Sequence, residues 1–86
     1  MFRKKRGIRL NYNKQGLIHF TCLDWKSQPK EIQDKIFDLC QDIGREDAQA
    51  LEEIVTTEKS IVEISLKYHL NEKYLYKMRK LFYERW

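Results

Sequence analysis

Apolar residues recur every three or four positions over most of this 86-residue chain. Residues spaced in this way lie on one face of an α-helix, which has about 3.6 residues per turn. The spacing predicts helices at residues 29–43 and 45–55, then a short and a longer helix within residues 60–82. Gly44 separates the first two, and we expect it to end the earlier helix in a left-handed conformation.

The first quarter of the chain alternates with a period of two instead, which is typical of half-buried strands. Gly16 lies where a left-handed residue would close the loop between two strands. The pattern therefore predicts a mainly α protein with an N-terminal β-hairpin at residues 8–23 followed by four helices. The apolar faces of the two expected strands are formed by Ile8, Leu10, Tyr12, Ile18, Phe20 and Cys22.

Residues 69–71 interrupt the apolar stripe between the last two predicted helices. Asn71 is a good N-cap, because its side-chain oxygen can accept a hydrogen bond from an unpaired amide of the next helix. Glu72 follows in the first turn, where a negative charge suits the helix dipole. We therefore expect a short helix, a tight turn and a longer helix, which resumes its apolar stripe at Leu75, Met78 and Phe82.

This stretch resembles the helix-turn-helix family of DNA-binding proteins. In that family a branched apolar residue and a small residue allow the two helices to cross closely, as Ile64 and Ser65 would here. The family usually has glycine where this chain has His69, and histidine tolerates a left-handed backbone better than most other residues. Residues 65–82 are also similar to the DNA-binding parts of insertion-sequence transposases and to the fourth region of bacterial sigma factors. The resemblance implies a three-helix domain at residues 45–86 whose last helix enters the DNA major groove.

Charge is distributed unevenly along the chain. Residues 1–14 carry six bases and no acid, residues 15–58 carry four bases and ten acids, and residues 59–86 carry seven bases and three acids. The resulting net charges of +6, −6 and +4 predict one basic face and one acidic face. The basic ends suit a phosphate backbone, and the acidic middle suits solvent or a basic protein partner.

The candidate DNA-contacting residues lie on the polar side of the last helix and in a basic arm at residues 1–6. Lysines spaced four and three apart share one side of a helix, and lysine can reach guanine or phosphate. Similar arms enter the minor groove in some DNA-binding domains. The predicted DNA-binding residues are Arg3, Lys4, Lys5, Arg6, Lys67, Asn71, Glu72, Lys73, Tyr76, Lys77 and Lys80.

Structural roles compete for several of these residues. Asn71 could be occupied as a cap and Glu72 could serve only the helix dipole. Tyr76 could pack on the hairpin, and Lys77 and Lys80 could form a solvated face. The arm could be a solubilising tail.

Composition narrows the class of protein. Eighty-six residues predict one small domain, and no apolar run approaches the roughly 18 residues of a transmembrane helix. Cys22 and Cys40 lack the spacing of a disulfide framework, which favours a reducing cytoplasm. On the expected strand His19 and Cys22 would point to opposite faces, so we predict no metal site and no other cofactor. With no Gly-rich phosphate loop and no base placed beside either cysteine, the chain is predicted not to be an enzyme.

These features predict a small protein that binds specific sequences of double-stranded DNA. The resemblance implies a transcriptional regulator of a phage or mobile element, acting as a homodimer on two half-sites through the hairpin. The alternative is a protein-interaction module whose acidic helices at residues 29–55 bind RNA polymerase or a replication or recombination enzyme. A third hypothesis is binding of single-stranded nucleic acid, with Tyr12, His19 or Phe20 of the hairpin stacking on bases.

Overall fold

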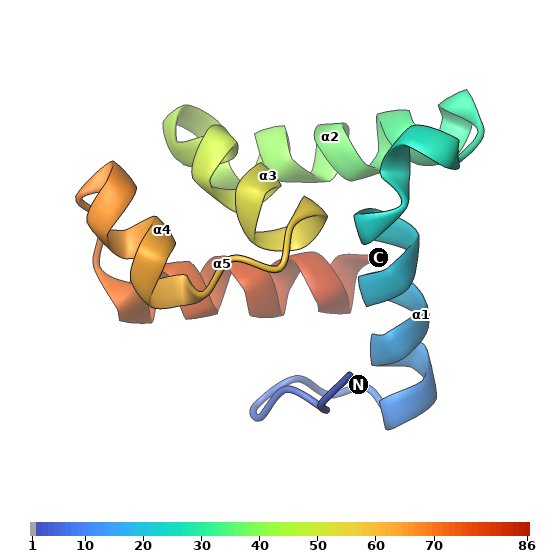
Figure 1. The fold of residues 1–86 in the computed structure, drawn as a ribbon, viewed down its shortest axis with the longest axis horizontal. Helices are drawn as coiled ribbons and strands as arrows, with labels where there is room; N and C mark the ends of the chain where they lie inside the picture. The colour runs from blue at the N-terminus through green and yellow to red at the C-terminus, as the bar shows by residue number, and fades with distance from the viewer. Residues whose placement is uncertain (1) are drawn as a thin grey trace.

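The computed structural model describes residues 2–86, and within them the chain forms helices and no β-strand (Figure 1). The mainly α class is therefore confirmed. Two 3-10 turns, Trp25–Ser27 and Arg45–Asp47, connect the first three of the α-helices. In chain order the helices are α1 (Tyr12–Leu23), α2 (Lys30–Gly44), α3 (Ala48–Thr56), α4 (Ile61–Tyr68) and α5 (Glu72–Arg85).

The predicted β-hairpin at residues 8–23 is wrong, because most of that range is α1. The side chain of Asn11 caps this helix by accepting a hydrogen bond of 2.9 Å from the Lys14 N–H. Ile18 and Cys22 are buried and four residues apart, so they fit a helical face as well as a strand. Gly16 is part of this helix and does not take the left-handed conformation expected of a loop.

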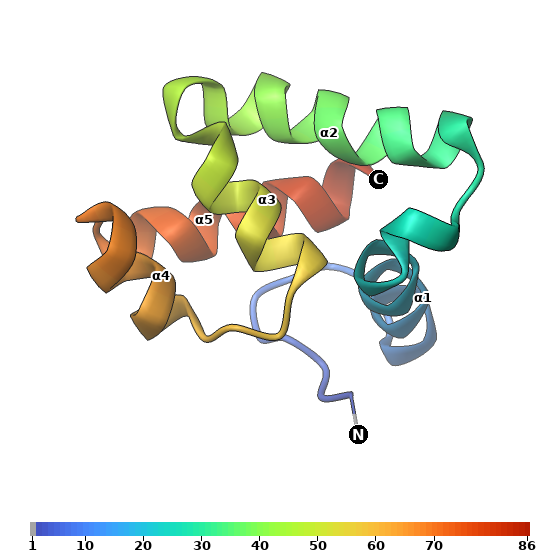
Figure 2. The same cartoon turned by 45° about the horizontal axis from the view of Figure 1, so that its top comes forward.

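Figures 1 and 2 show α2 running alongside α5, with α3 packed against both and α1 lying across the end near the C-terminus. Each helix contributes to the core. Its fully buried side chains include Cys22, Ile36, Leu51, Ile64 and Phe82, one from each helix in turn. One apolar core therefore joins the helix-turn-helix pair to the rest of the chain.

The turn between α4 and α5 has the conformation expected from the sequence. His69 has φ 56° and ψ 44°, which is left-handed, as the resemblance implies for this position. The Leu70 N–H donates to the Ser65 carbonyl at 3.1 Å, and the Ser65 hydroxyl donates to the Leu70 carbonyl at 2.6 Å. Asn71 then caps α5 by accepting a hydrogen bond of 2.8 Å from the Lys73 N–H.

Gly44 does not have the left-handed conformation predicted for it. Gly44 keeps a right-handed backbone, and the positive φ of 51° belongs to Arg45. A Cβ on Gly44 would lie 3.6 Å from the Cβ of Ala48 and 3.8 Å from Met78 Sδ. The glycine therefore lies against its neighbours in the core, while the chain reverses one residue later.

The basic segment at the N-terminus packs against the helices; Met1 lies outside the described residues. Phe2 is only 7% exposed, and its ring lies 4.9 Å from the ring of His19, centroid to centroid. Gln15 is fully buried and accepts a 2.7 Å hydrogen bond from the Lys5 N–H, while its own amide donates to the Leu10 carbonyl at 2.9 Å. Because one buried side chain binds the backbone at both ends of residues 5–10, this segment is held against α1.

Candidate nucleic-acid interface

Helix α5 has one face in the core and one face in solvent. Leu75 and Met78 are buried as their spacing predicted, and they place Lys73, Tyr76 and Lys77 on the opposite, exposed side. Tyr76 is 47% exposed, which is unusual for an aromatic side chain packed into a core. The alternative that Tyr76 packs on a hairpin is excluded, because there is no hairpin in residues 2–86.

A groove of about 420 Å³ lies between this side of α5 and the N-terminal segment. Five cationic side chains line it, and no carboxylate does. Arg6 is among them, so the segment and the helix contribute to one basic surface although they are far apart in the sequence. The lining consists of Arg6, Ile8, Lys73, Tyr76, Lys77, Arg79 and Lys80.

The N-terminal segment contacts the later turns of α5 and leaves the first turns open. The Arg9 N–H donates a 3.0 Å hydrogen bond to Glu84, and Lys5 Nζ lies 5.5 Å from the centroid of the Tyr83 ring. Both views draw this segment on the side of α5 opposite α2 (Figures 1 and 2). The exposed start of α5 is the part that helix-turn-helix proteins direct at base edges.

Arg79 lines the groove but is not among the DNA-binding residues predicted from the sequence. Its guanidinium carbon lies 5.0 Å from the centroid of the Tyr76 ring, a distance typical of a cation–π contact. The side chain is half-buried, and this burial lowers the pKa of its guanidinium. Arg79 directly follows the buried Met78 in α5. Its position next to the apolar stripe could have predicted that it lies at the edge of the core.

The two residues at the start of α5 have structural roles. The Asn71 side-chain oxygen accepts from the Lys73 N–H, so the cap that competed with base reading is formed. Glu72 is exposed in the first turn, where its charge suits the helix dipole. Neither residue lines the basic groove.

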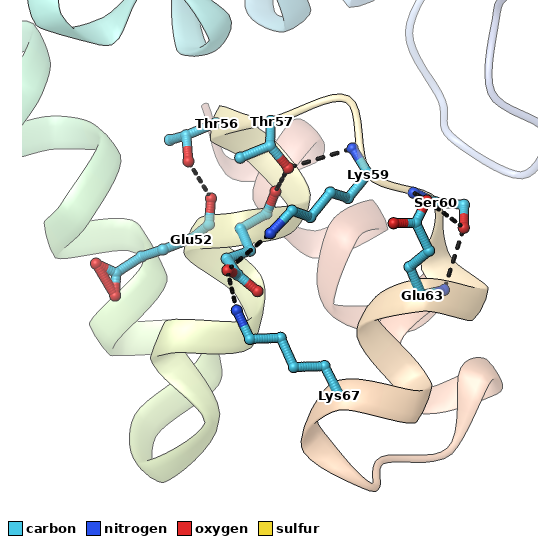
Figure 3. A network of polar contacts seen from close by, with 8 residues as sticks. Glu52, Thr56, Thr57, Lys59, Ser60, Glu63 and Lys67 are labelled. Carbon is cyan, nitrogen blue, oxygen red and sulfur yellow. Dashed lines mark hydrogen bonds and ion pairs between the residues drawn. The ribbon is translucent and has the colours of Figure 1, made fainter.

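Lys67 lies away from the groove and is paired with an acid. Its Nζ is 2.6 Å from Glu53 Oε1, and Lys59 Nζ is 3.4 Å from the same oxygen (Figure 3). The hydrogen bond from Lys67 is the main reason why the pKa of the Glu53 carboxyl is lowered. In Figure 3, Ser60 and Glu63 cap α4 beside this cluster, with the Glu63 N–H donating to Ser60 Oγ at 3.1 Å. The ammonium of Lys67 therefore ties α4 to α3.

The other predicted arm residues are divided between solvent and a second cavity. Arg3 and Lys4 are exposed, whereas Lys5 is half-buried. Arg3 and Lys5 line a separate cavity together with Arg79, which borders both spaces. Of the four basic residues at positions 3–6, the structure brings Arg6 to the groove.

Other chemistry has little support in the described residues. Nowhere in residues 2–86 do three His, Cys, Asp or Glu side chains gather closely enough to hold a metal ion. Cys22 and Cys40 are free and buried, and burial raises the pKa of the Cys22 thiol to about 12. The pKa of Cys40 is raised for the same reason, so both thiols stay protonated and unreactive near neutral pH. None of the described helices has both the length and the apolar character needed to cross a membrane.

No family model, curated protein or solved structure matches this chain. The likeness of residues 65–82 to helix-turn-helix proteins therefore stays a prediction from the residues themselves.

Proposed function

We propose that this chain binds double-stranded DNA by placing the start of α5 in the major groove. The observation that carries the proposal is the groove in which Arg6, Lys73, Lys77, Arg79 and Lys80 meet around Tyr76 without a carboxylate. Five cations on one face give a strong attraction for the phosphate backbone, which supplies much of the affinity of DNA-binding proteins.

The exposed residues of α5 contribute to both the affinity and the sequence specificity of DNA binding. The DNA major groove is about 12 Å wide and admits one helix, so exposed side chains on the first turns of α5 face base edges. Lys73 and Lys77 are suited to phosphate or guanine, and Tyr76 to a base edge or sugar. Its cation–π contact with Arg79 restrains the Tyr76 ring, which favours a defined contact with DNA.

The biological setting follows from the resemblance alone. Likeness to transposases and sigma factors favours a cytoplasmic transcriptional regulator of a phage or mobile element, and two free, buried thiols suit a reducing compartment. One α5 covers one half-site, so we infer that two copies bind together. The hairpin is no longer available as the dimer surface or as a stacking platform for single strands, since residues 12–23 are helical.

Binding of fluorescent random duplexes by the natural protein, measured by anisotropy across a salt series, tests this proposal. The bound fraction is recovered and sequenced. We expect a duplex motif with two related half-sites, and analytical ultracentrifugation of the complex then gives two protein copies per duplex. Weak binding that returns no motif and disappears with modest salt would contradict sequence-specific recognition.

The substitution Lys77→Ala tests whether Lys77 contacts a DNA phosphate directly or only adds to the net positive charge of the protein. If Lys77 touches a phosphate, the substitution lowers affinity for all duplexes and reduces the salt slope by about one. Lys30→Ala is the matched control, because it removes the same charge from the exposed start of α2, away from the groove. Equal effects of the two substitutions would refute a specific role for Lys77.

Tyr76→Ala tests sequence reading. We expect the motif to relax at one or two base pairs while the salt slope stays unchanged, since the tyrosine carries no charge. The ratio of affinities for the selected duplex and a scrambled one is the measurement. An unchanged ratio in a folded variant would place base recognition elsewhere.

A second function, docking of a basic protein partner, has its own observation. Asp34, Asp38 and Asp42 are exposed at four-residue intervals, so they form an acidic stripe along α2. Figure 1 shows that α2 and the N-terminal segment lie on opposite sides of α5. The double substitution of Asp34→Asn and Asp38→Asn should weaken binding to purified RNA polymerase, or to a replication or recombination enzyme, without changing duplex affinity. If the double variant loses only duplex binding and keeps its protein binding, the docking role of the acidic stripe is excluded.

A further inference from the structure

A second basic cavity lies on the other side of Arg79 from the DNA-facing groove. It has a volume of about 420 Å³ and is bounded by the N-terminal segment, α1, the loop between α3 and α4, and α5. Arg3, Lys5, Lys59 and Arg79 bring four positive charges to its lining, and Glu58 is the single carboxylate there. Its size is within the range of protein sites for small ligands.

Arg79 presents an unused donor in this part of the structure. Its Nε atom is buried and has no hydrogen-bond partner in residues 2–86. Buried polar groups are normally hydrogen-bonded, and a charged one without a partner is especially costly. The guanidinium stacks on Tyr76, which lines the neighbouring groove and not this cavity, so a ligand in the cavity reaches the Nε–H when the guanidinium turns away from that ring.

Lys5 is a second cation in the lining of this cavity, and its ammonium is not paired with the carboxylate there. It forms no ion pair with any residue from 2 to 86, and its Nζ lies 4.7 Å from the centroid of the Phe2 ring. The pKa of Lys5 is lowered to about 8, mainly by burial and to a smaller extent by repulsion from Arg79. Gln15 accepts a hydrogen bond from the backbone N–H of Lys5, so the backbone of this residue is held against α1.

We propose that Lys5 and Arg79 form a binding site for a phosphate group in this cavity. Once the guanidinium of Arg79 turns toward the cavity, one phosphate oxygen can accept from its Nε–H and a neighbouring oxygen from its terminal N–H groups, while the Lys5 ammonium balances the remaining charge. Arginine suits this task because its planar donors match the spacing of phosphate oxygens. Arg3 adds attraction and Glu58 opposes it, while Lys59 is already paired with Glu53.

The phosphate has two possible sources. One is a free phosphate or a small phosphate ester, and the other is the backbone of the DNA that we propose for the neighbouring groove. Arg79 borders both spaces, so either ligand would satisfy the same donor. The second source depends on the proposed function, whereas the first does not.

Titration of the natural protein with inorganic phosphate tests the site, with chloride used to hold ionic strength constant. The readout is the NMR resonance of the Arg79 Nε–H, which reports the unused donor itself. A saturable shift of this resonance would support the site, provided that phosphate affinity falls at least tenfold in Lys5→Gln, measured on the same resonance, and in Arg79→Lys, measured by isothermal titration calorimetry. Arg79→Lys is informative because it keeps the charge but lacks the Nε–H. Lys30→Gln is the matched control and should leave the phosphate affinity unchanged.

The same resonance is then followed during titration with the selected duplex. A shift that requires Lys5 and appears with DNA but not with inorganic phosphate identifies the backbone as the source. Saturable binding of inorganic phosphate without competition by DNA identifies a free ligand. No saturable shift with either probe, or the same shift with chloride alone, overturns the proposal. Weak duplex binding that returns no motif would refute the proposed function, whereas saturable binding of inorganic phosphate at Arg79 would still support the phosphate site, so the two failures are distinguishable.

Discussion

Replacing Lys5 with methionine tests whether the fold keeps a charge that costs stability. The fall in the pKa of Lys5 from 10.5 to about 8 corresponds to about 3.5 kcal/mol at about 1.4 kcal/mol per pH unit. The side chain is half exposed, so solvent screening reduces this cost to about 1–2 kcal/mol. The substitution also removes the cation–π contacts with the rings of Phe2 and Tyr83, which contribute about 1 kcal/mol to the stability of the fold. Lys5→Met should therefore raise the free energy of unfolding by up to about 1 kcal/mol near neutral pH.

The pH dependence of this gain is the sharper test. The folded-state pKa of Lys5 is about 8 and the unfolded value is 10.5, so between these pH values the unfolded chain binds more protons. The stability contributed by this group therefore rises with pH across that window. The advantage of Lys5→Met should shrink over the same window. Arg79 and Tyr83 of α5 and His19 of α1 also lie near Lys5. Burial, with a smaller contribution from Lys5, lowers the pKa of His19 from its ordinary value of 6.5, so His19 stays mainly neutral in both proteins across this window and adds little to the difference.

Urea unfolding, followed by tryptophan fluorescence near pH 7 and again near pH 10, measures the difference directly. Lys30→Met is the control, since it removes the same charge from an exposed position. The reasoning is refuted if Lys5→Met lowers stability near neutral pH, or if its gain is as large at the higher pH as at the lower one.

Three further substitutions or measurements probe the fold. His69→Gly should raise the free energy of unfolding by about 1 kcal/mol, because glycine takes the left-handed backbone without strain; a loss of stability in urea unfolding would contradict this. Gln15→Ala should lower that free energy by about 2–3 kcal/mol and speed hydrogen exchange at the Lys5 amide, since it leaves backbone groups at both ends of residues 5–10 without their partner. Unchanged exchange would show that another contact holds the segment. Cys22 and Cys40 should react with a thiol reagent only as fast as the protein opens, so fast labelling without denaturant would contradict their burial.

The residues of the candidate interface were predicted to different extents. Lys73, Tyr76 and Lys77 could be placed from the helical period alone, because a buried stripe on one side of α5 fixes the opposite side as exposed. The partners of Lys67 and Arg79 could not, since Glu53 comes from another helix and the cavity around Arg79 includes the N-terminal segment. Contacts between distant segments depend on how the helices pack, and local spacing carries no record of that packing.

The sequence by itself determined the helical class, the uneven charge and the turn before α5. These features depend on local chemistry: His69 takes a left-handed backbone, Asn71 caps the next helix, and an apolar stripe follows. Tertiary structure decided the state of residues 12–23, because Ile18 and Cys22 fit both a strand and a helix until a core is available to bury them. It also decided the place of the N-terminal segment, since only the packed helices bury Phe2 and Gln15, and that burial brings Lys5 beside Arg79.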